Sequence, residues 1–414
     1  MAPVVDSYTT VDDALGLVLA RVRKHRRTDL VPVAQSYGRV LSADVTAPKD
    51  VPPSSTSHMD GYAVNSADIK DATSSRPVVL RVVDATGPGS RSKVPLQGGD
   101  AIRVATGAML PAGSDAVVPI ESVDVEGKEV RVNSAVRPGE HVYKAGQDIR
   151  RGEVVLAAGR RIRAQDVGTL VALGLRKIAV RRRVRVAVMA TGNELTPAGI
   201  PRKGKTVESH SIVFLRLVEA MGCVGIDVGI ARDEEKLLRA ALRSALSAAD
   251  FVVTLGGTSA GERDLVVSAV SGLRPDELVH GLKLDRGRVT GLASVGGKPI
   301  LMLPGPIQAA ANAFLVVGIP IIGALSGSKE TNLSIPCVLG ATWEARKRFS
   351  DFQKVVYVRL KPGPPAVAEP IAGETESMKV LSDADGYFIV KQDTSRLEEG
   401  DRVQVMLVPG FSFS

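Results

Sequence analysis

Cysteines, aromatic residues and long apolar runs are all scarce in this chain of 414 residues. The two cysteines, Cys223 and Cys337, are too few and too far apart for a cysteine-based metal cluster, and they fit a reducing cytoplasm. The chain has no apolar run of about 18 residues, and its most apolar segment, 314–325, is interrupted by Pro320 and too short to span a bilayer. Residues 1–10 lack the pattern of a signal peptide. We therefore expect a cytoplasmic globular protein without membrane insertion.

Positive charge is in excess, with a formal net charge of +8 at pH 7. The basic residues cluster in segments 21–27, 150–151, 160–163 and 181–183. Such patches can bind nucleic acid, but aromatic residues make up only 4% of the chain and no nucleic-acid motif accompanies them. Solvated helix faces and strand ends explain the clusters better, so we expect no nucleic-acid partner.

The chain is long enough for about two to four domains, and its patterns change along the sequence. Residues 10–24 have the apolar spacing of a helix, with Thr10 at the N-cap position. Short strands with frequent glycines over residues 78–142 predict a small all-β module. Strands alternate with helices from Val184, which predicts a doubly wound α/β domain, and residues 333–408 predict a small β barrel or open sheet.

The stretch FVVTLGGTSAGERD, residues 251–264, carries the clearest local signal for a ligand. An apolar strand, residues 251–255, ends in a glycine-rich turn, residues 256–261, whose free amides and hydroxyls suit a phosphate or another oxyanion. The carboxylates of Glu262 and Asp264 indicate a divalent cation as an alternative ligand. Taken alone, the turn has a third interpretation, a tight strand-to-helix connection that binds nothing.

The ends of the neighbouring strands decide between these alternatives. In doubly wound sheets, ligands bind beyond the carboxyl ends of the strands. Here those ends carry the sequences TGNE, ARD, GGTSAGERD and LPGP. Four loops with glycines or carboxylates on one edge favour a ligand site over an empty turn.

Motifs in a fixed order extend this pattern to nearly the whole chain: HMDGYAV, RVATGAMLPAGSDAVV, GQDI, MATGNEL, GGTSAGERD and LPG. The chain thereby resembles the MoeA/gephyrin family of molybdopterin molybdenumtransferases. The resemblance implies a linker domain split between residues 1–46 and 143–177, a small β domain of residues 47–142, a MogA-like, doubly wound α/β domain of residues 178–328 and a C-terminal β barrel of residues 329–414.

The resemblance also implies a homodimer with a site between the α/β domain of one copy and the β domain of the other. There the family binds adenylylated molybdopterin and molybdate with Mg²⁺, hydrolyses the adenylate and inserts the metal. Asp60, Thr106, Glu194 and Asp264 match the family's catalytic positions, and the carboxylates of Glu194 and Asp264 are candidate Mg²⁺ ligands. The candidate residues for binding the cofactor precursor are Gly256, Gly257, Thr258, Ser259, Gly261, Arg288, Pro304 and Gly305.

Several positions depart from the family's motifs. Where the family has KPGKP, this chain has Asp285, Arg286 and Arg288, and Gln308 stands where the serine of LPGNPVS is expected. His210 replaces the asparagine of the family's DSN, where a helix cap or a packed side chain is the simplest interpretation. An aspartate facing a pterin phosphate costs about 1 to 4 kcal/mol at about 4 Å, which Arg288 offsets in part. We expect the changes at Asp285 and Gln308 and the loss of the LPGNPVS asparagine to cluster in one anion pocket.

Two functions from different classes follow from the resemblance. One is an active molybdenumtransferase with altered anion contacts. The other is a gephyrin-like dimeric scaffold with reduced or lost catalysis, which binds a peptide tail of a cytoskeletal, cell-division or membrane protein. By analogy with gephyrin, the peptide groove would lie around residues 328–348 and 402–411.

Overall fold

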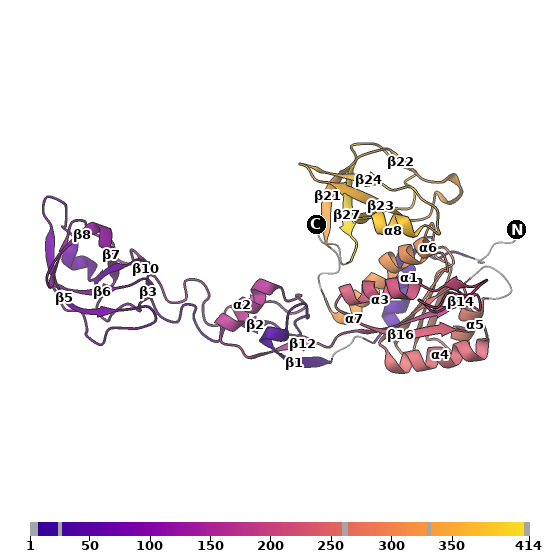
Figure 1. The fold of residues 1–414 in the computed structure, drawn as a ribbon, viewed down its shortest axis with the longest axis horizontal. Helices are drawn as coiled ribbons and strands as arrows, with labels where there is room; N and C mark the ends of the chain where they lie inside the picture. Colours follow the sequence, from indigo (N-terminus) through magenta and orange to yellow (C-terminus); the bar gives the residue numbers. More distant parts are fainter. Residues whose placement is uncertain (1–6, 24–26, 259–263, 329–332, 410–414) are drawn as a thin grey trace.

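The computed structural model describes residues 7–23, 27–258, 264–328 and 333–409. The chain is elongated (Figure 1). A small β module lies at one end, a linker domain lies in the middle, and an α/β domain and a C-terminal barrel lie together at the other end.

The sheet of the α/β domain has six strands in the order β16-β13-β17-β20-β19-β18. The first four run parallel, and β19 and β18 form an antiparallel edge. Their bounds are β13 (Arg185–Thr191), β16 (Val224–Ala231), β17 (Phe251–Leu255), β18 (Glu277–His280), β19 (Gly291–Val295) and β20 (Lys298–Leu303). The central strands are apolar almost throughout because helices cover both faces of the sheet.

Two hydrophobic clusters, one on each face, hold the helices to this sheet. One face packs against α4 (Glu235–Ala248) and α5 (Leu265–Ser271). The other packs against α1 (Val11–Arg21), α3 (His210–Ala220), α6 (Ile307–Ala313) and α7 (Ile319–Ser326). Two short strands, β14 (Leu195–Thr196) and β15 (Thr206–Val207), pair beside the sheet. This arrangement confirms the doubly wound α/β domain.

Helix α1 begins as its sequence predicts, because the hydroxyl oxygen of Thr10 accepts a hydrogen bond from the Asp13 amide at 3.1 Å. Its buried residues Val11, Ala14 and Val18 belong to the core of the α/β domain. Residues 11–21 therefore pack with the α/β domain, and not with the linker domain to which residues 1–46 were expected to belong.

Helices α6 and α7 join through a π-helical turn, Phe314–Gly318, into one helical stretch of 20 residues, Ile307–Ser326. The wider turn precedes Pro320, whose ring nitrogen has no hydrogen to donate, so the helix continues through the proline. By length and composition alone the stretch could cross a membrane, because it includes α6 as well as the segment 314–325. However, 83% of its most apolar window is buried inside the protein, as expected of a core helix.

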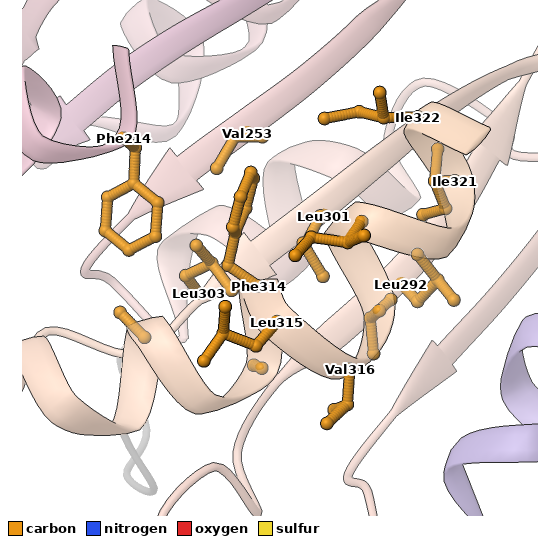
Figure 2. Packing of buried hydrophobic residues seen from close by; sticks show 14 of the residues in the cluster. Phe214, Val253, Leu292, Leu301, Leu303, Phe314, Leu315, Val316, Ile321 and Ile322 are labelled. Carbon is orange, nitrogen blue, oxygen red and sulfur yellow. The ribbon is translucent and has the colours of Figure 1, made fainter. Parts of the chain in front are cut away.

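Figure 2 shows how this helical stretch fills the core of the domain. Phe314 meets Phe214 of α3 edge-on, with ring centroids 5.2 Å apart. Leu303 and Leu301 of β20 lie against the same helices. The packing fixes the carboxyl end of β20, from which part of the candidate site projects.

The small β module is a six-stranded sheet in the order β7-β4-β6-β5-β9-β8. Its strands are β4 (Gly61–Val64), β5 (Val78–Thr86), β6 (Asp100–Val104), β7 (Ala116–Pro119), β8 (Val123–Glu126) and β9 (Glu129–Val132), with β3 (Thr56–Ser57) and β10 (Val142–Tyr143) paired beside them. In the linker domain, β1 (Thr28–Pro32) pairs with β12 (Lys177–Arg181), and β2 (Val45–Thr46) with β11 (Val154–Leu156) next to α2 (Ala164–Ala172). The linker domain is thus built from two separate parts of the chain.

The C-terminal region is a closed barrel in the order β21-β24-β23-β25-β27. Its elements are β21 (Ser334–Leu339), β23 (Lys354–Lys361), β24 (Ala366–Pro370), β25 (Gly386–Val390) and β27 (Arg402–Leu407), with the pair β22 (Trp343–Glu344) and β26 (Arg396–Leu397) and helix α8 (Met378–Asp383). Short 3-10 turns are Val33–Gln35, Ser66–Ile69, Ile120–Ser122 and Lys347–Phe349. The expected barrel is confirmed.

Candidate functional site

A cavity of about 540 Å³ opens at the carboxyl edge of the α/β sheet. The strand after β13, β16, lies on one side of it, and the next parallel strand, β17, lies on the other side. The strand order therefore reverses between β13 and β17. Ligands of doubly wound folds bind at such a switch point. The cavity brings together seven of the predicted residues, which are Glu194, Gly256, Gly257, Thr258, Arg288, Pro304 and Gly305.

The glycine pair after β17 is required by the backbone. Gly256 and Gly257 have φ angles of +87° and +69°, a region that favours glycine. A Cβ on Gly256 would lie 2.8 Å from the carbonyl oxygen of Thr191, and a Cβ on Gly257 would lie 2.5 Å from Val266 Cγ2. The loop therefore passes directly over the end of β13, where only glycines fit.

Thr258 follows this pair and lines the cavity with 1% of its surface exposed. Its hydroxyl is buried and has no hydrogen-bond partner among the described residues. A buried hydroxyl without a partner costs free energy, which a ligand oxygen at this position would recover. Two other predicted binding residues, Ser259 and Gly261, lie outside the described residues.

Glu194 is exposed at the mouth of the cavity, on the loop that follows β13. Asp233, at the end of β16, holds this loop: its carboxylate accepts hydrogen bonds from Thr191 Oγ1 at 2.8 Å and from the Asn193 amide at 2.9 Å. Lys205 Nζ donates to the carbonyl of Asn193 at 2.6 Å. The ARD sequence predicted that Asp233 lies at the carboxyl edge of the sheet. Only the structure shows that Asp233 is hydrogen-bonded to the loop after β13.

His210 lies at the start of α3 and also lines the cavity. Burial lowers the pKa of its imidazole, while the Glu208 carboxylate and a hydrogen bond to the Gly305 backbone act in the opposite direction. His210 is thus a packed side chain, as expected, and in addition part of the cavity wall. It connects the start of α3 to the loop after β20.

The Asp264 carboxylate contacts the first turn of α5 and His280. The carboxylate caps α5, accepting from the Val267 amide at 3.3 Å, and lies 3.3 Å from His280 Nε2. Burial raises its pKa, and the nearby His280 opposes that shift. Asp264 does not line the cavity that contains Glu194.

Mg²⁺ needs several oxygen ligands in octahedral geometry. Across the described residues, no group of three or more His, Cys, Asp or Glu side chains that could hold a metal ion is found. Within the described residues, Glu194 and Asp264 are thus separate carboxylates and do not belong to an assembled set of three protein ligands.

Asp60 and Thr106 lie together on the β module. The Asp60 Oδ1 atom accepts from the Thr106 amide at 2.6 Å and from its hydroxyl at 2.8 Å. These two bonds lower the pKa of Asp60, because they stabilise the charged form. The linker domain lies between the small β module, which carries this pair, and the α/β domain, whose residues line the cavity (Figure 1). One chain therefore presents the predicted catalytic residues in two distant groups.

Three family models match consecutive parts of the chain. The MoeA N-terminal region (domains I and II) matches residues 9–174, a probable molybdopterin binding domain matches residues 187–324, and the MoeA C-terminal region (domain IV) matches residues 337–408. Molybdopterin molybdenumtransferase 2 of Mycobacterium tuberculosis is 30% identical over 400 residues, covering 94% of this chain and 97% of that protein. This chain belongs to the MoeA family.

Other relatives agree with this assignment. The molybdopterin molybdenumtransferase of Bacillus subtilis is 30% identical over 406 residues, covering 96% of this chain and 94% of that protein. A crystal structure of the molybdopterin biosynthesis MoeA protein from Pyrococcus horikoshii is 29% identical and superposes with a TM-score of 0.85 over 98% of this chain and 100% of that one. The comparisons confirm the family resemblance, and they do not support the scaffold alternative over the enzyme.

Asp285 and Gln308 share one cavity, as expected, but Gly305 and Pro306, which flank the missing asparagine, line the cavity at the sheet edge. Asp285 and Gln308 line a second cavity, of about 500 Å³, between α6 and the C-terminal barrel. Asp285 pairs there with Arg346 at 2.6 Å, and Arg286 donates to Gln308 and to the Gly373 carbonyl. The Asp285 carboxylate is therefore neutralised by a barrel arginine.

Arg288 instead lines the cavity at the sheet edge. Its guanidinium carbon lies 4.9 Å from the centre of the Phe349 ring, a cation–π contact with the C-terminal region. The chain thus keeps a cation at the candidate site, because Arg288 replaces the second lysine of the family's KPGKP motif.

Proposed function

We propose that this protein is a molybdopterin molybdenumtransferase, which takes adenylylated molybdopterin and molybdate as substrates in molybdenum cofactor biosynthesis. The cavity at the switch point of the α/β sheet is the observation that carries the proposal. It combines the Gly256–Gly257 turn, the cation of Arg288 and the Thr258 hydroxyl, which has no hydrogen-bond partner among the described residues. Relatives named as this enzyme match the chain over nearly its whole length.

Each group in the cavity has a role that suits this substrate. The backbone amides of the glycine turn and the Thr258 hydroxyl would donate hydrogen bonds to phosphate oxygens. The Arg288 guanidinium would pair with the anionic substrate, and its contact with Phe349 restricts its orientation. Glu194, exposed at the mouth, would accept a proton or orient a water near the phosphate.

The active site would be completed by a second copy of the chain. Asp60 and Thr106 belong to the small β module, which lies at the opposite end of the chain from the α/β domain that carries Glu194 (Figure 1). A two-fold dimer would bring the β module of each copy to the cavity of the other, as isologous contacts allow. In that arrangement the low pKa of Asp60 keeps its carboxylate charged at the shared site.

Binding of Mg²⁺ would also depend on the dimer. The carboxylates of Glu194 and Asp264 have the right donor chemistry, but the described residues of one chain do not assemble three ligands. We therefore assign Mg²⁺ binding to a site that Asp60 of the second copy helps to complete. The free, buried cysteines Cys223 and Cys337 support a location in the cytoplasm, where thiols stay reduced.

Complementation of a molybdenumtransferase-deficient cell tests the enzyme. Glu194→Gln and Asp264→Asn should abolish restoration of molybdoenzyme activity, because each removes a proposed catalytic carboxylate. The matched controls are Glu219→Gln and Asp227→Asn, which remove exposed carboxylates of α3 and β16 and should complement like the wild type. Full rescue by both site variants would rule out this assignment of the chemistry.

Binding of a peptide tail of a cytoskeletal, cell-division or membrane protein is a second proposal. The cavity between α6 and the barrel supports it, because Trp343 offers aromatic surface beside Arg346 and Glu374. Trp343 is the only tryptophan of the chain, so its fluorescence reports binding there directly. Synthetic candidate tails should change the emission of the wild type and bind Trp343→Ala more weakly. If no tail that binds the protein perturbs Trp343, this proposal is wrong.

A further inference from the structure

Two basic segments that are far apart in sequence meet at the amino edge of the α/β sheet. Pairing of β1 with β12 sets Thr28 opposite Arg181, and the Arg182 amide donates to the carbonyl of Arg27 at 3.0 Å. A cavity of about 520 Å³ lies beside them, lined by Arg23, Arg27, Arg182, Arg185, Asp250 and Lys298 among others. This cavity is separate from the candidate active site, because it lies where β13, β17 and β20 begin and not where they end.

The charges that line this amino-edge cavity do not balance. Four arginines and one lysine face a single aspartate among its lining residues. Asp250 is already engaged: it pairs with Arg182 at 3.0 Å and accepts from the Arg185 amide at 2.9 Å. Lys298 Nζ donates to the carbonyl of Ala249 at 3.0 Å.

Three guanidinium groups remain, those of Arg23, Arg27 and Arg185. All three residues are exposed, and none has a carboxylate partner among the described residues. Like charges around one hollow repel each other, and a concave basic surface concentrates anions from solution. An anion bound between these groups would relieve the repulsion.

The backbone also holds one of these arginines in place. The Arg23 amide donates to the carbonyl of Gly297 at 2.9 Å, in the turn between β19 and β20. A Cβ on Gly297 would lie 2.5 Å from Arg23 Cγ, so the absence of a side chain lets the Arg23 stem lie across the turn. Its position is therefore fixed by the fold.

From these observations we propose that the amino-edge cavity binds a small soluble anion with two or more phosphate groups. Guanidinium groups pair with phosphate oxygens through two parallel hydrogen bonds, which a single spherical anion cannot accept. The volume lies in the range of small-molecule sites. The proposal does not depend on catalysis, because none of these residues lines the cavity of the candidate active site.

Inorganic pyrophosphate is the probe, titrated into the full-length protein by calorimetry at low ionic strength without divalent metal. Arg288→Gln serves as the background, so that binding at the candidate active site is weakened. Arg23→Gln and Arg185→Gln should each weaken binding about tenfold, the loss of one charge-assisted interaction. The matched control is Arg131→Gln, an exposed arginine of β9 in the distant β module, which should leave the Kd unchanged.

Arg185→Lys separates recognition from charge alone. The lysine keeps the positive charge but lacks the planar fork, so binding should weaken although the net charge is the same. Thermal unfolding of each variant confirms that the protein is folded. The proposal is refuted if pyrophosphate fails to bind at millimolar concentration, or if Arg131→Gln weakens binding as much as Arg23→Gln does.

Discussion

Replacing Asp233 with alanine tests whether its carboxylate holds the loop that carries Glu194. The substitution removes an acceptor for two hydrogen bonds, from Thr191 Oγ1 at 2.8 Å and from the Asn193 amide at 2.9 Å. Thr191 is buried, so its hydroxyl is left without this partner, whereas the exposed Asn193 amide can bond to water. We expect the free energy of unfolding to fall by about 2 kcal/mol, most of it from Thr191.

The assay is urea-induced unfolding followed by circular dichroism, together with molybdenum insertion by the same samples. Asp227→Ala is the matched control on β16, because Asp227 is exposed and, within the described parts of the chain, its side chain accepts only from the nearby Gly229 amide at 2.8 Å. It should change stability by no more than about 0.5 kcal/mol. Asp233→Asn retains one acceptor oxygen and should be intermediate in stability. Equal stability and equal activity of the two alanine variants would show that Asp233 does not hold the loop.

Three further predictions follow from the pKa shifts. Burial raises the folded pKa of Asp264, so its ionisation costs stability as pH rises; Asp264→Asn should therefore be more stable than the wild type in urea at pH 7, with a smaller difference at pH 4. Thr106→Ala removes one bond to the Asp60 carboxylate, so an NMR titration should show a higher pKa for Asp60 than in the wild type. Burial raises the pKa of the Cys223 thiol to about 12 and also raises that of Cys337, so the folded protein should react with a thiol reagent far more slowly than the urea-unfolded chain. Rapid labelling of the folded protein, or unchanged pKa and stability in the other two cases, would contradict these assignments.

Local pattern was sufficient to predict most elements of the α/β domain. Strand β17 has the predicted bounds, residues 251–255, because a strand buried on both faces is a continuous apolar run that ends at glycine. The carboxyl-edge rule then placed the loops after β13, β17 and β20 on one edge, and the structure shows them around one cavity.

Long-range packing could not be predicted in the same way. The helical spacing of residues 10–24 does not specify which domain the helix packs on, and α1 packs on the α/β sheet. Asp285 and Arg288 are three positions apart, yet they line different cavities, because the Arg286 backbone has a positive φ of 51° and the chain turns between them. The convergence of the two basic segments depends on the pairing of β1 with β12, which no local pattern shows.

The central claim is that each active site is assembled from two copies of the chain. Mixing two inactive variants, Asp60→Asn and Glu194→Gln, tests it most directly. In a shared site, a heterodimer has one doubly altered site and one intact site. Random mixing makes half of the dimers heterodimers, so the mixture should recover about one quarter of the wild-type activity. If the site is instead complete within one chain, refolding the two variants together will restore no activity, and light scattering of the wild type at micromolar concentration will be compatible with a monomer.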